Sequence, residues 1–451
     1  SFLFGFGMAF LAGGVGAGSL LMIPKFVYEP GGDFTGFLIA RVQEARRVKT
    51  AEELLAEALE RSREIKGLYM TADVASYKDA GATRLRRNIV DLAQGTEING
   101  IVIDVKEVCG PDYDEGNLRE VLRELKEKNI WSIARIVVFK DHSQVEAHPE
   151  WYLKRESPIA VGNECWNKKH LRVKPTPGAN GQMSNVVLWR DKRGGYWLDP
   201  ASPGARRYIL DFSKKMVDLG FDELQFDYIR FPSDGDVDKS IYPVWDGRIS
   251  KYSVMKSFFE YLNKNLKEHK PDIILSADLF GYAAIRAGDV GIGQRLEDIG
   301  DNFDYISFMV YPSHYYSGLF LYADQLNGLP AVDFNRNEAR ANPDTVVHRS
   351  LQAARDFLDG RVATSTKVTS LNTESGATTT VEKIANPVPR SRARLRPWLE
   401  DFFHEEDQAA GRPHGIQKVR MQIEAAERVE KHGWLLWNAA NIYTEEALRK
   451  E

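Results

Sequence analysis

Cysteine is scarce in this chain, which has only Cys109 and Cys165 among its 451 residues. No Cys-x-x-Cys or His-Glu-x-x-His spacing occurs, so the sequence predicts neither a zinc site nor any other metal or cofactor. The two cysteines are expected in loops on the same side of the fold. Two interpretations stay open, one disulfide in an exported protein or two unpaired thiols.

Three further signals are missing. The absence of a Gly-x-Ser-x-Gly turn argues against a serine hydrolase. No Gly-rich phosphate turn follows the first predicted strand, which argues against a doubly wound open sheet. The net charge is −4, and no basic stripe with interleaved aromatic residues occurs, so no nucleic-acid partner is expected. What remains is the composition of a globular protein, 43% hydrophobic and 27% charged.

The first residues carry no charge from Phe2 to Ile23, and the run ends at Pro24-Lys25. A run of this length can span a bilayer, and Gly14-x-x-x-Gly18 suits close helix packing. We expect residues 1–25 to be a transmembrane anchor or a signal segment, with a buried apolar tail as the alternative. An anchor or signal predicts a membrane-anchored or secreted protein whose catalytic domain is extracytoplasmic.

Beyond a linker and leading helix (26–65), strand-like and helix-like segments alternate from 66 to 445. Continuous apolar runs such as Ile101-Val-Ile103 are typical of parallel strands covered on both faces. The pattern predicts a (β/α)8 TIM barrel with a long insertion (about 141–200) after the third strand. A doubly wound open sheet is the alternative. Strands are expected at 67–74, 100–105, 131–139, 222–228, 272–278, 304–310, 393–399 and 434–440, and helices at 50–66, 78–95, 117–129, 203–220, 250–269, 294–301, 344–359 and 415–432.

Two aspartates stand at the carboxyl ends of neighbouring predicted strands, Asp227 and Asp278. Ligands of a barrel gather at that end, and cleavage of a glycosidic bond needs one ionised and one protonated carboxyl group. We predict this pair to be catalytic. Arg230 would favour the ionised form of Asp227, and enclosure near Phe280 would let Asp278 keep a proton, although the roles can be exchanged. A structural cap is the alternative for each.

Other polar and aromatic residues are predicted at the same strand ends, where they would contact a sugar substrate. Asp104 and Lys106 can instead form a structural ion pair, and the two tryptophans can close the barrel core instead of stacking on sugars. The predicted substrate contacts are Asp104, Lys106, Arg135, Tyr228, Arg230, Tyr282, Tyr311, His314, Arg396, Trp398, Asp401, Trp437 and Asn438.

Five motifs stand at the predicted strand ends. They are Gln225-Phe-Asp-Tyr-Ile-Arg-Phe-Pro232, Ile103-Asp-Val-Lys106, Ala277-Asp-Leu-Phe-Gly281, Met309-Val-Tyr-Pro-Ser-His314 and Arg396-Pro-Trp-Leu399. Together they resemble a bacterial family of glycosidase-like TIM-barrel domains classed as a domain of unknown function.

The resemblance covers about residues 66–443 and implies a barrel that is often exported or membrane-attached. In related glycosidases an Asp at the end of strand four is commonly the nucleophile, which implies Asp227; many relatives use Glu in place of Asp278 or carry the acid on another strand. Glu400 stands where an amide is expected.

These features predict one of two classes of function. The first is a glycoside hydrolase that cleaves a polysaccharide, with the cell envelope as one source of that polymer and a transglycosylase as a variant that shares the same site. The second is a non-catalytic carbohydrate-binding barrel at the cell surface. Two converging carboxylates favour the enzyme, because a binding module has no need of them.

Overall fold

A computed structural model describes residues 48–157, 164–165, 187–286, 288–362 and 387–450, together with the backbone of two short strands at 368–369 and 378–379. The chain divides into residues 1–49 and 50–451, and the second unit contains every strand of the barrel. The predicted anchor or signal lies outside the described residues. Within the described ranges, no helix is long and apolar enough to cross a membrane.

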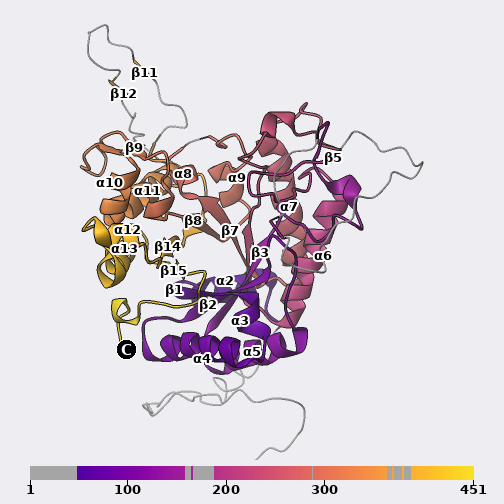
Figure 1. Cartoon of the computed structure of the whole chain (residues 1–451), viewed down its shortest axis with the longest axis horizontal. Coiled ribbons are helices and arrows are strands. Elements are labelled where there is room, and N and C mark those ends of the chain that lie inside the picture. The colour runs from indigo at the N-terminus through magenta and orange to yellow at the C-terminus, as the bar shows by residue number, and fades with distance from the viewer. Residues whose placement is uncertain are drawn as a thin grey trace, which may run out of the picture. The chain divides into compact units, whose positions relative to one another are not determined.

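The second unit is built on a closed parallel barrel (Figure 1), as predicted, and the open-sheet alternative is wrong. Strand β1 closes the ring by pairing with both β2 and β15, with Gly67 opposite Gly100 on one side and Leu435 on the other. The wall consists of β1 (Ile65–Met70), β2 (Gly100–Lys106), β3 (Trp131–Val137), β6 (Glu223–Asp227), β7 (Ile274–Phe280), β8 (Tyr305–Met309), β13 (Arg394–Leu395) with β14 (Trp398–Glu400), and β15 (Gly433–Trp437).

The seventh wall position is interrupted. The sequence predicts one strand over 393–399, but β13 ends at Leu395 and β14 begins at Trp398. Pro397 lies between them and has no N–H to donate to a neighbouring strand. Its carbonyl still accepts a hydrogen bond from the Leu435 N–H at 2.8 Å, so the wall stays closed.

Every predicted helix is present, and the caps explain where several of them begin and end. Thr50 starts the leading helix with a capping box, and Ser202 with Pro203 starts α6. Gly220 ends α6 in a left-handed conformation that costs glycine little (φ 109°). The predicted helices correspond to α2 (Ala51–Arg61), α4 (Ala80–Gly95), α5 (Glu115–Glu127), α6 (Pro203–Leu219), α7 (Lys251–His269), α9 (Leu296–Gly300), α11 (Pro343–Leu358) and α13 (Gly415–Val429).

Several short helices and one hairpin were not expected from the sequence, and each of these helices completes fewer than two turns. They decorate the loops at the carboxyl end of the barrel. These are the helices α3 (Ala72–Ser76), α8 (Gly281–Ala284), α10 (Arg336–Ala341) and α12 (Glu405–Ala409), and the hairpin of β9 (Leu319–Leu321) with β10 (Val332–Phe334).

The long insertion after β3 is tied to the barrel in two ways. Cys109, just beyond β2, forms a disulfide with Cys165, which decides between the two interpretations of the cysteines. Trp189 and Trp197, both within the insertion, are buried, and the N–H of Leu198 donates to the Phe139 carbonyl just beyond β3. Inside the insertion, β4 (Lys154–Arg155) pairs with β5 (Val187–Leu188). The insertion therefore adds its own packed layer beside the ends of β2 and β3.

Candidate functional site

Four charged side chains meet at the carboxyl end of the barrel, and we call Asp104, Arg135, Asp227 and Asp278 the carboxylate centre. Nη1 of Arg135 lies 2.5 Å from Oδ1 of Asp104, Nη2 contacts Oδ2 of Asp227, and Nε lies 3.6 Å from Oδ2 of Asp278. One guanidinium thus faces three carboxyl groups. All four residues had been predicted at this end of the barrel.

Strand register brings these groups together. Arg135 on β3 lies opposite Asp104 on β2 and Gln225 on β6, and Asp227 lies opposite Val137. The β2–β3 ladder is irregular between Asp104 and Lys106, and such a bulge re-aims the side chains that follow it. Asp104 consequently joins the centre, and Lys106 does not.

Asp278 is placed to hold a proton. Its side chain is only 1% exposed, and Oδ1 accepts a 2.8 Å hydrogen bond from Nε1 of Trp398. Burial, with the negative charge of Asp227, raises the pKa of Asp278 well above its usual range, although Arg135 and Trp398 act in the opposite direction. Oδ2 has no hydrogen-bond partner among the described residues. A neutral Asp278 therefore carries an uncommitted O–H beside Arg135.

Asp227 is held differently. Its Oδ1 accepts a 2.6 Å hydrogen bond from the backbone N–H of Tyr228, and its Oδ2 contacts Arg135. Tyr228 has a φ of 49°, which is uncommon for a residue other than glycine and typical of functional sites. This backbone conformation presents the N–H of Tyr228 to the Asp227 carboxylate.

Asp104 completes the centre from the opposite side. The Tyr69 hydroxyl donates a 2.5 Å hydrogen bond to its Oδ2, and burial raises the pKa of Asp104 against the effect of Arg135. Three carboxyl groups thus share one cation. With Asp278 protonated, the centre keeps an excess of negative charge that suits a developing positive charge on a sugar ring.

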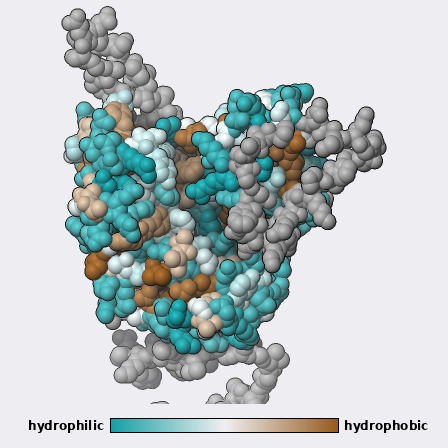
Figure 2. Space-filling model, viewed as in Figure 1, coloured by the Kyte–Doolittle hydropathy of each residue, from teal (hydrophilic) through white to brown (hydrophobic). Residues whose placement is uncertain are grey.

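Aromatic rings border the carboxylate centre on the side of β8, β14 and β15. Tyr311 stacks on Trp437 with ring centroids 5.6 Å apart, and Phe402 packs edge-on against Trp437 at 4.9 Å. His314 lies 5.1 Å from Tyr311, and burial lowers its pKa, which favours a neutral imidazole. We call Tyr311, His314, Phe402 and Trp437 the aromatic wall. Figure 2 shows the molecule in the view of Figure 1, with a hollow near the middle that hydrophilic and hydrophobic side chains border.

The sequence left open whether Trp398, Asp401 and Asn438 contact a sugar or have a structural role. In the structure, each of them has partners within the protein. Trp398 is buried and donates to Asp278, so it orients a carboxyl group and does not present a free face for stacking. Asp401 accepts from the N–H and hydroxyl of Thr444, and Nδ2 of Asn438 donates to the Asp401 carbonyl at 2.6 Å. These residues join the loops after β14 and β15.

Arg230 and Tyr228 lie next to the carboxylate centre. Neither side chain forms a hydrogen bond or an ion pair with Asp227 among the described contacts. The Arg230 guanidinium lies over the rings of Phe280, at 4.4 Å from the centroid, and Tyr228, and Nη1 donates to the Phe231 carbonyl. The cation in contact with Asp227 is Arg135. The predicted role of Arg230 beside that carboxylate therefore belongs to Arg135.

Two predicted contacts, Lys106 and Tyr282, have partners within the protein. Lys106 is fully buried, paired with Asp141 at 2.8 Å, so the suggested Asp104–Lys106 pair does not form. The Tyr282 hydroxyl donates to the Gly318 carbonyl and packs on a neighbouring loop.

Arg396 lies at the opposite end of the barrel, and its predicted substrate contact is wrong. Its Nη1 pairs with Glu223 at 2.7 Å, and Nη2 donates to the Ser62 carbonyl. Glu223 is the first residue of β6, so this ion pair closes the amino end of the barrel. Because Pro397 interrupts the strand, the motif that contains Arg396 crosses the wall from one end toward the other.

Two residues of the site were missed as candidates. Tyr69 is buried on β1 like Leu68 and Met70 beside it, and only its hydroxyl, a group that needs a partner when buried, could have indicated it. Phe402 follows a strand end directly, which is the signal that had selected its neighbours. Neither residue carries a charge, whereas charged groups and tryptophans made up most of the predicted contacts.

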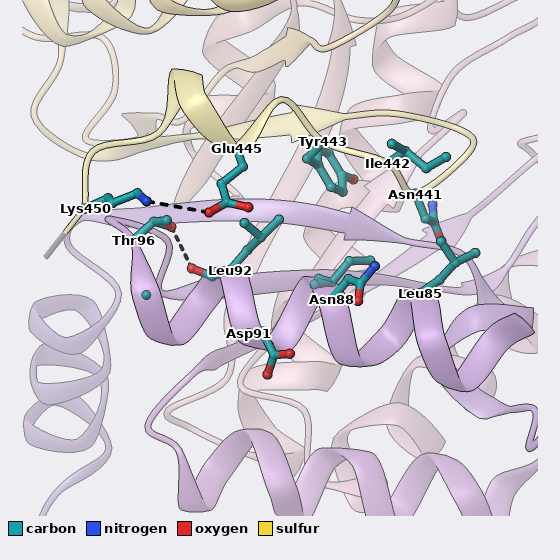
Figure 3. Close-up of a pocket in the computed structure, with 12 residues that line it drawn as sticks. Leu85, Asn88, Asp91, Leu92, Thr96, Asn441, Ile442, Tyr443, Glu445 and Lys450 are labelled. Carbon is teal, nitrogen blue, oxygen red and sulfur yellow. Dashed lines mark hydrogen bonds and ion pairs between the residues drawn. The ribbon is translucent and has the colours of Figure 1, made fainter. Parts of the chain in front are cut away.

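A second hollow lies between α4 and the C-terminal segment, and it contains no comparable cluster (Figure 3). Leu85, Leu92 and Ile442 supply apolar surface there, and Asp91 points away from the C-terminal segment. Glu445 faces Lys450 at 4.0 Å. The chemistry of the fold is concentrated at the barrel mouth.

A parallel barrel with paired carboxyl groups and aromatic rings at its carboxyl end is the architecture of a glycosidase-like domain. A family described as "Putative glycosyl hydrolase domain" matches residues 67–443, and the chain belongs to that family. The family resemblance inferred from the five motifs is thereby confirmed.

Several solved structures are similar to this chain. A hypothetical protein from Ruminiclostridium thermocellum is 29% identical, with 47% of this chain and 96% of that chain covered and a TM-score of 0.34. The PgaB (BpsB) glycoside hydrolase domain from Bordetella bronchiseptica is 13% identical, with 84% and 95% covered and a TM-score of 0.48. A debranching enzyme from Nostoc punctiforme is 12% identical, with 81% and 69% covered and a TM-score of 0.42. No curated protein matches. The assignment rests on the family match.

Proposed function

We propose that the protein is a glycoside hydrolase that cleaves a polysaccharide at the carboxylate centre. The observation that carries the proposal is the arrangement around Arg135, which holds Asp227 beside an Asp278 whose raised pKa keeps a proton. A protonated and an ionised carboxyl group in one site are the two components that hydrolysis of a glycosidic bond requires.

In this proposal Asp278 is the general acid. It gives the proton on Oδ2 to the oxygen of the leaving sugar as the bond to the anomeric carbon breaks. Asp227 stays ionised beside Arg135 and stabilises the positive charge that develops on the ring, as nucleophile or as charge stabiliser. A water molecule then adds to the anomeric carbon and gives a proton to Asp278, which restores the acid. Trp398 fixes the orientation of Asp278 from the side opposite the free oxygen.

A non-catalytic carbohydrate-binding barrel is the second candidate, and one observation favours it. Asp227 and Asp278 are only 4% and 1% exposed, so a substrate must reach them past Arg135, whose side chain is 17% exposed. A barrel that only binds glycans would keep the aromatic wall and leave these carboxyl groups as a buried structural network.

We further propose that the domain works outside the cytoplasm, at the membrane or secreted, on a polysaccharide that can belong to the cell envelope. The Cys109–Cys165 disulfide supports an oxidising compartment. The uncharged run from Phe2 to Ile23 supports attachment to, or passage across, a membrane.

A glycan panel assayed with wild type, Asp227→Asn and Asp278→Asn tests the proposal, with Asp246→Asn as the control because that carboxylate is exposed. We expect wild type and the control to release reducing ends from at least one glycan, and both site variants to lose at least about 100-fold in kcat, a typical loss for acid–base groups. Equal release by wild type and Asp227→Asn would remove that residue from catalysis. Binding without release by any of the four proteins would support the carbohydrate-binding barrel.

A further inference from the structure

A groove runs between the loops that follow β14 and β15, beside the aromatic wall. It encloses about 610 Å3, within the range of about 300–1,000 Å3 typical of ligand sites. Residues of both loops line it, among them Phe402, Phe403, Trp437, Asn438, Ile442 and Tyr443.

Two apolar side chains that line the groove are largely exposed to solvent. The Phe403 ring is 63% exposed and Ile442 is 64% exposed, and both line the same space as the half-buried Phe402 and Trp437. Single exposed apolar residues are ordinary, whereas contiguous ones beside a cleft mark a binding surface. Flat aromatic rings of this kind suit the apolar faces of sugars.

Trp437 links the groove to the carboxylate centre. One neighbour of its ring is Phe402, and another is Tyr69, whose ring centroid lies 6.1 Å away. Tyr69 in turn donates its hydroxyl to Asp104. Trp437 therefore lines the groove and also contacts a residue that bonds to the carboxylate centre, so the groove and the centre are neighbours.

Internal hydrogen bonds hold the groove in shape. Thr444 donates to Asp401 from its N–H at 2.7 Å and its hydroxyl at 2.8 Å, and the Tyr443 hydroxyl donates to the Tyr69 carbonyl. Oδ1 of Asn441 accepts from the N–H of Thr71 at 3.0 Å. A preformed surface binds without the cost of ordering its own loops.

We propose that this groove is a subsite that stacks on sugar units of a glycan chain whose next units occupy the carboxylate centre, an inference that rests on the proposed function. The carboxylate of Asp401 and the amide of Asn438 already bond within the protein, so the rings supply the contact. Stacking depends on the apolar face of a sugar ring and little on its substituents. Only a chain long enough to reach both the groove and the carboxylate centre gains from this contact. The subsite therefore favours long chains, and the substrate class is a polymer with several neighbouring sugar units.

The test is Phe403→Ala, compared with Phe320→Ala as the control. Phe320 is similarly exposed, at 56%, but lies on β9 and does not line the groove. With oligosaccharides of increasing length from the hydrolysed glycan, we expect the loss of kcat/KM in Phe403→Ala to grow with length and reach about two- to tenfold, the scale of one aromatic contact. Phe403→Trp should restore it, and the control should follow wild type at every length. A loss independent of length, or no loss, would overturn the subsite.

A binding measurement separates this inference from the proposed function. Affinity electrophoresis in gels that contain each polysaccharide of the panel reports binding whether or not the protein cleaves it. If wild type binds a polysaccharide but releases reducing ends from no glycan of the panel, and Phe403→Ala is less retarded than wild type and Phe320→Ala, the hydrolase is refuted and the groove is kept. Equal retardation of all three proteins would refute the proposal that the groove binds sugar units, whether or not the protein cleaves the polysaccharide.

Discussion

Replacement of Asp278 by Asn tests the protonation state on which the proposed chemistry depends. The amide keeps an oxygen that accepts from Nε1 of Trp398 and places an N–H group where the protonated acid has its hydroxyl. Asp278→Asn therefore mimics the neutral acid at every pH. Because the side chain is 1% exposed, solvent screening does little to weaken the effect.

The sign of the effect is set by the raised pKa of Asp278 in the folded protein. Well below about pH 3.9, the usual pKa of an aspartate, the carboxyl group is neutral in both states, so the stability difference between acid and amide should not change with pH. As the pH rises, the unfolded chain ionises while the folded protein keeps its proton, which lowers the stability of wild type only. The difference grows by about 1.4 kcal/mol per pH unit until the folded pKa is reached.

The variant should therefore gain stability relative to wild type as the pH is raised above about 4. Urea unfolding at several pH values measures this gain. With a denaturant slope of about 3 kcal/mol/M, each kcal/mol gained moves the midpoint upward by about 0.3 M. Asp246→Asn, at an exposed position, is the matched control and should show no comparable trend.

Two results would refute the reasoning. A variant that is less stable than wild type at neutral pH would show that the folded protein needs an ionised Asp278. A difference that does not change with pH would show that the carboxyl group titrates alike in both states. In either case Asp278 could not be the proton donor of the proposed reaction.

Three further predictions test other parts of the structure. Trp398→Phe removes a donor that lowers the pKa of Asp278, so the alkaline limb of kcat against pH should move to higher pH. Lys106→Met leaves the carboxylate of Asp141 buried without its cation and should cost about 3–5 kcal/mol in urea unfolding; adding Asp141→Asn should recover part of that loss. Gly220→Ala forces a side chain into a left-handed conformation at the end of α6 and should cost about 1–2 kcal/mol by the same measurement, although no atom lies near the added Cβ.

The order of strands and helices was open to prediction because each depends on nearby residues. Apolar runs and caps such as Thr50 and Ser202 act within a few residues, and strictly alternating units leave few closed arrangements. The short helices α3, α8, α10 and α12 were not predicted, because each completes fewer than two turns and so shows little helical periodicity. The interruption of the strand at Pro397 was also missed, although a proline, which has no N–H to donate, argues against an unbroken strand.

The partners within the site could not be predicted in the same way. Arg230 follows Asp227 closely in sequence, yet the cation that contacts this carboxylate is Arg135, from a different strand. Lys106 follows Asp104 by two residues, but the bulge between them sends it to Asp141. Sequence distance says little about such pairs, because register and bulges set where each side chain points.

By itself, the sequence determined the barrel, the end of it that carries the chemistry, and the presence of carboxyl groups there. These depend on hydrophobic periodicity and on which residues follow each strand. Only the tertiary structure decided that Arg135 faces three carboxyl groups, that Arg396 belongs to the opposite end, and that Cys109 pairs with Cys165. Closure of the ring brings together residues far apart in the chain, and the burial that shifts the pKa of Asp278 exists only once it has closed.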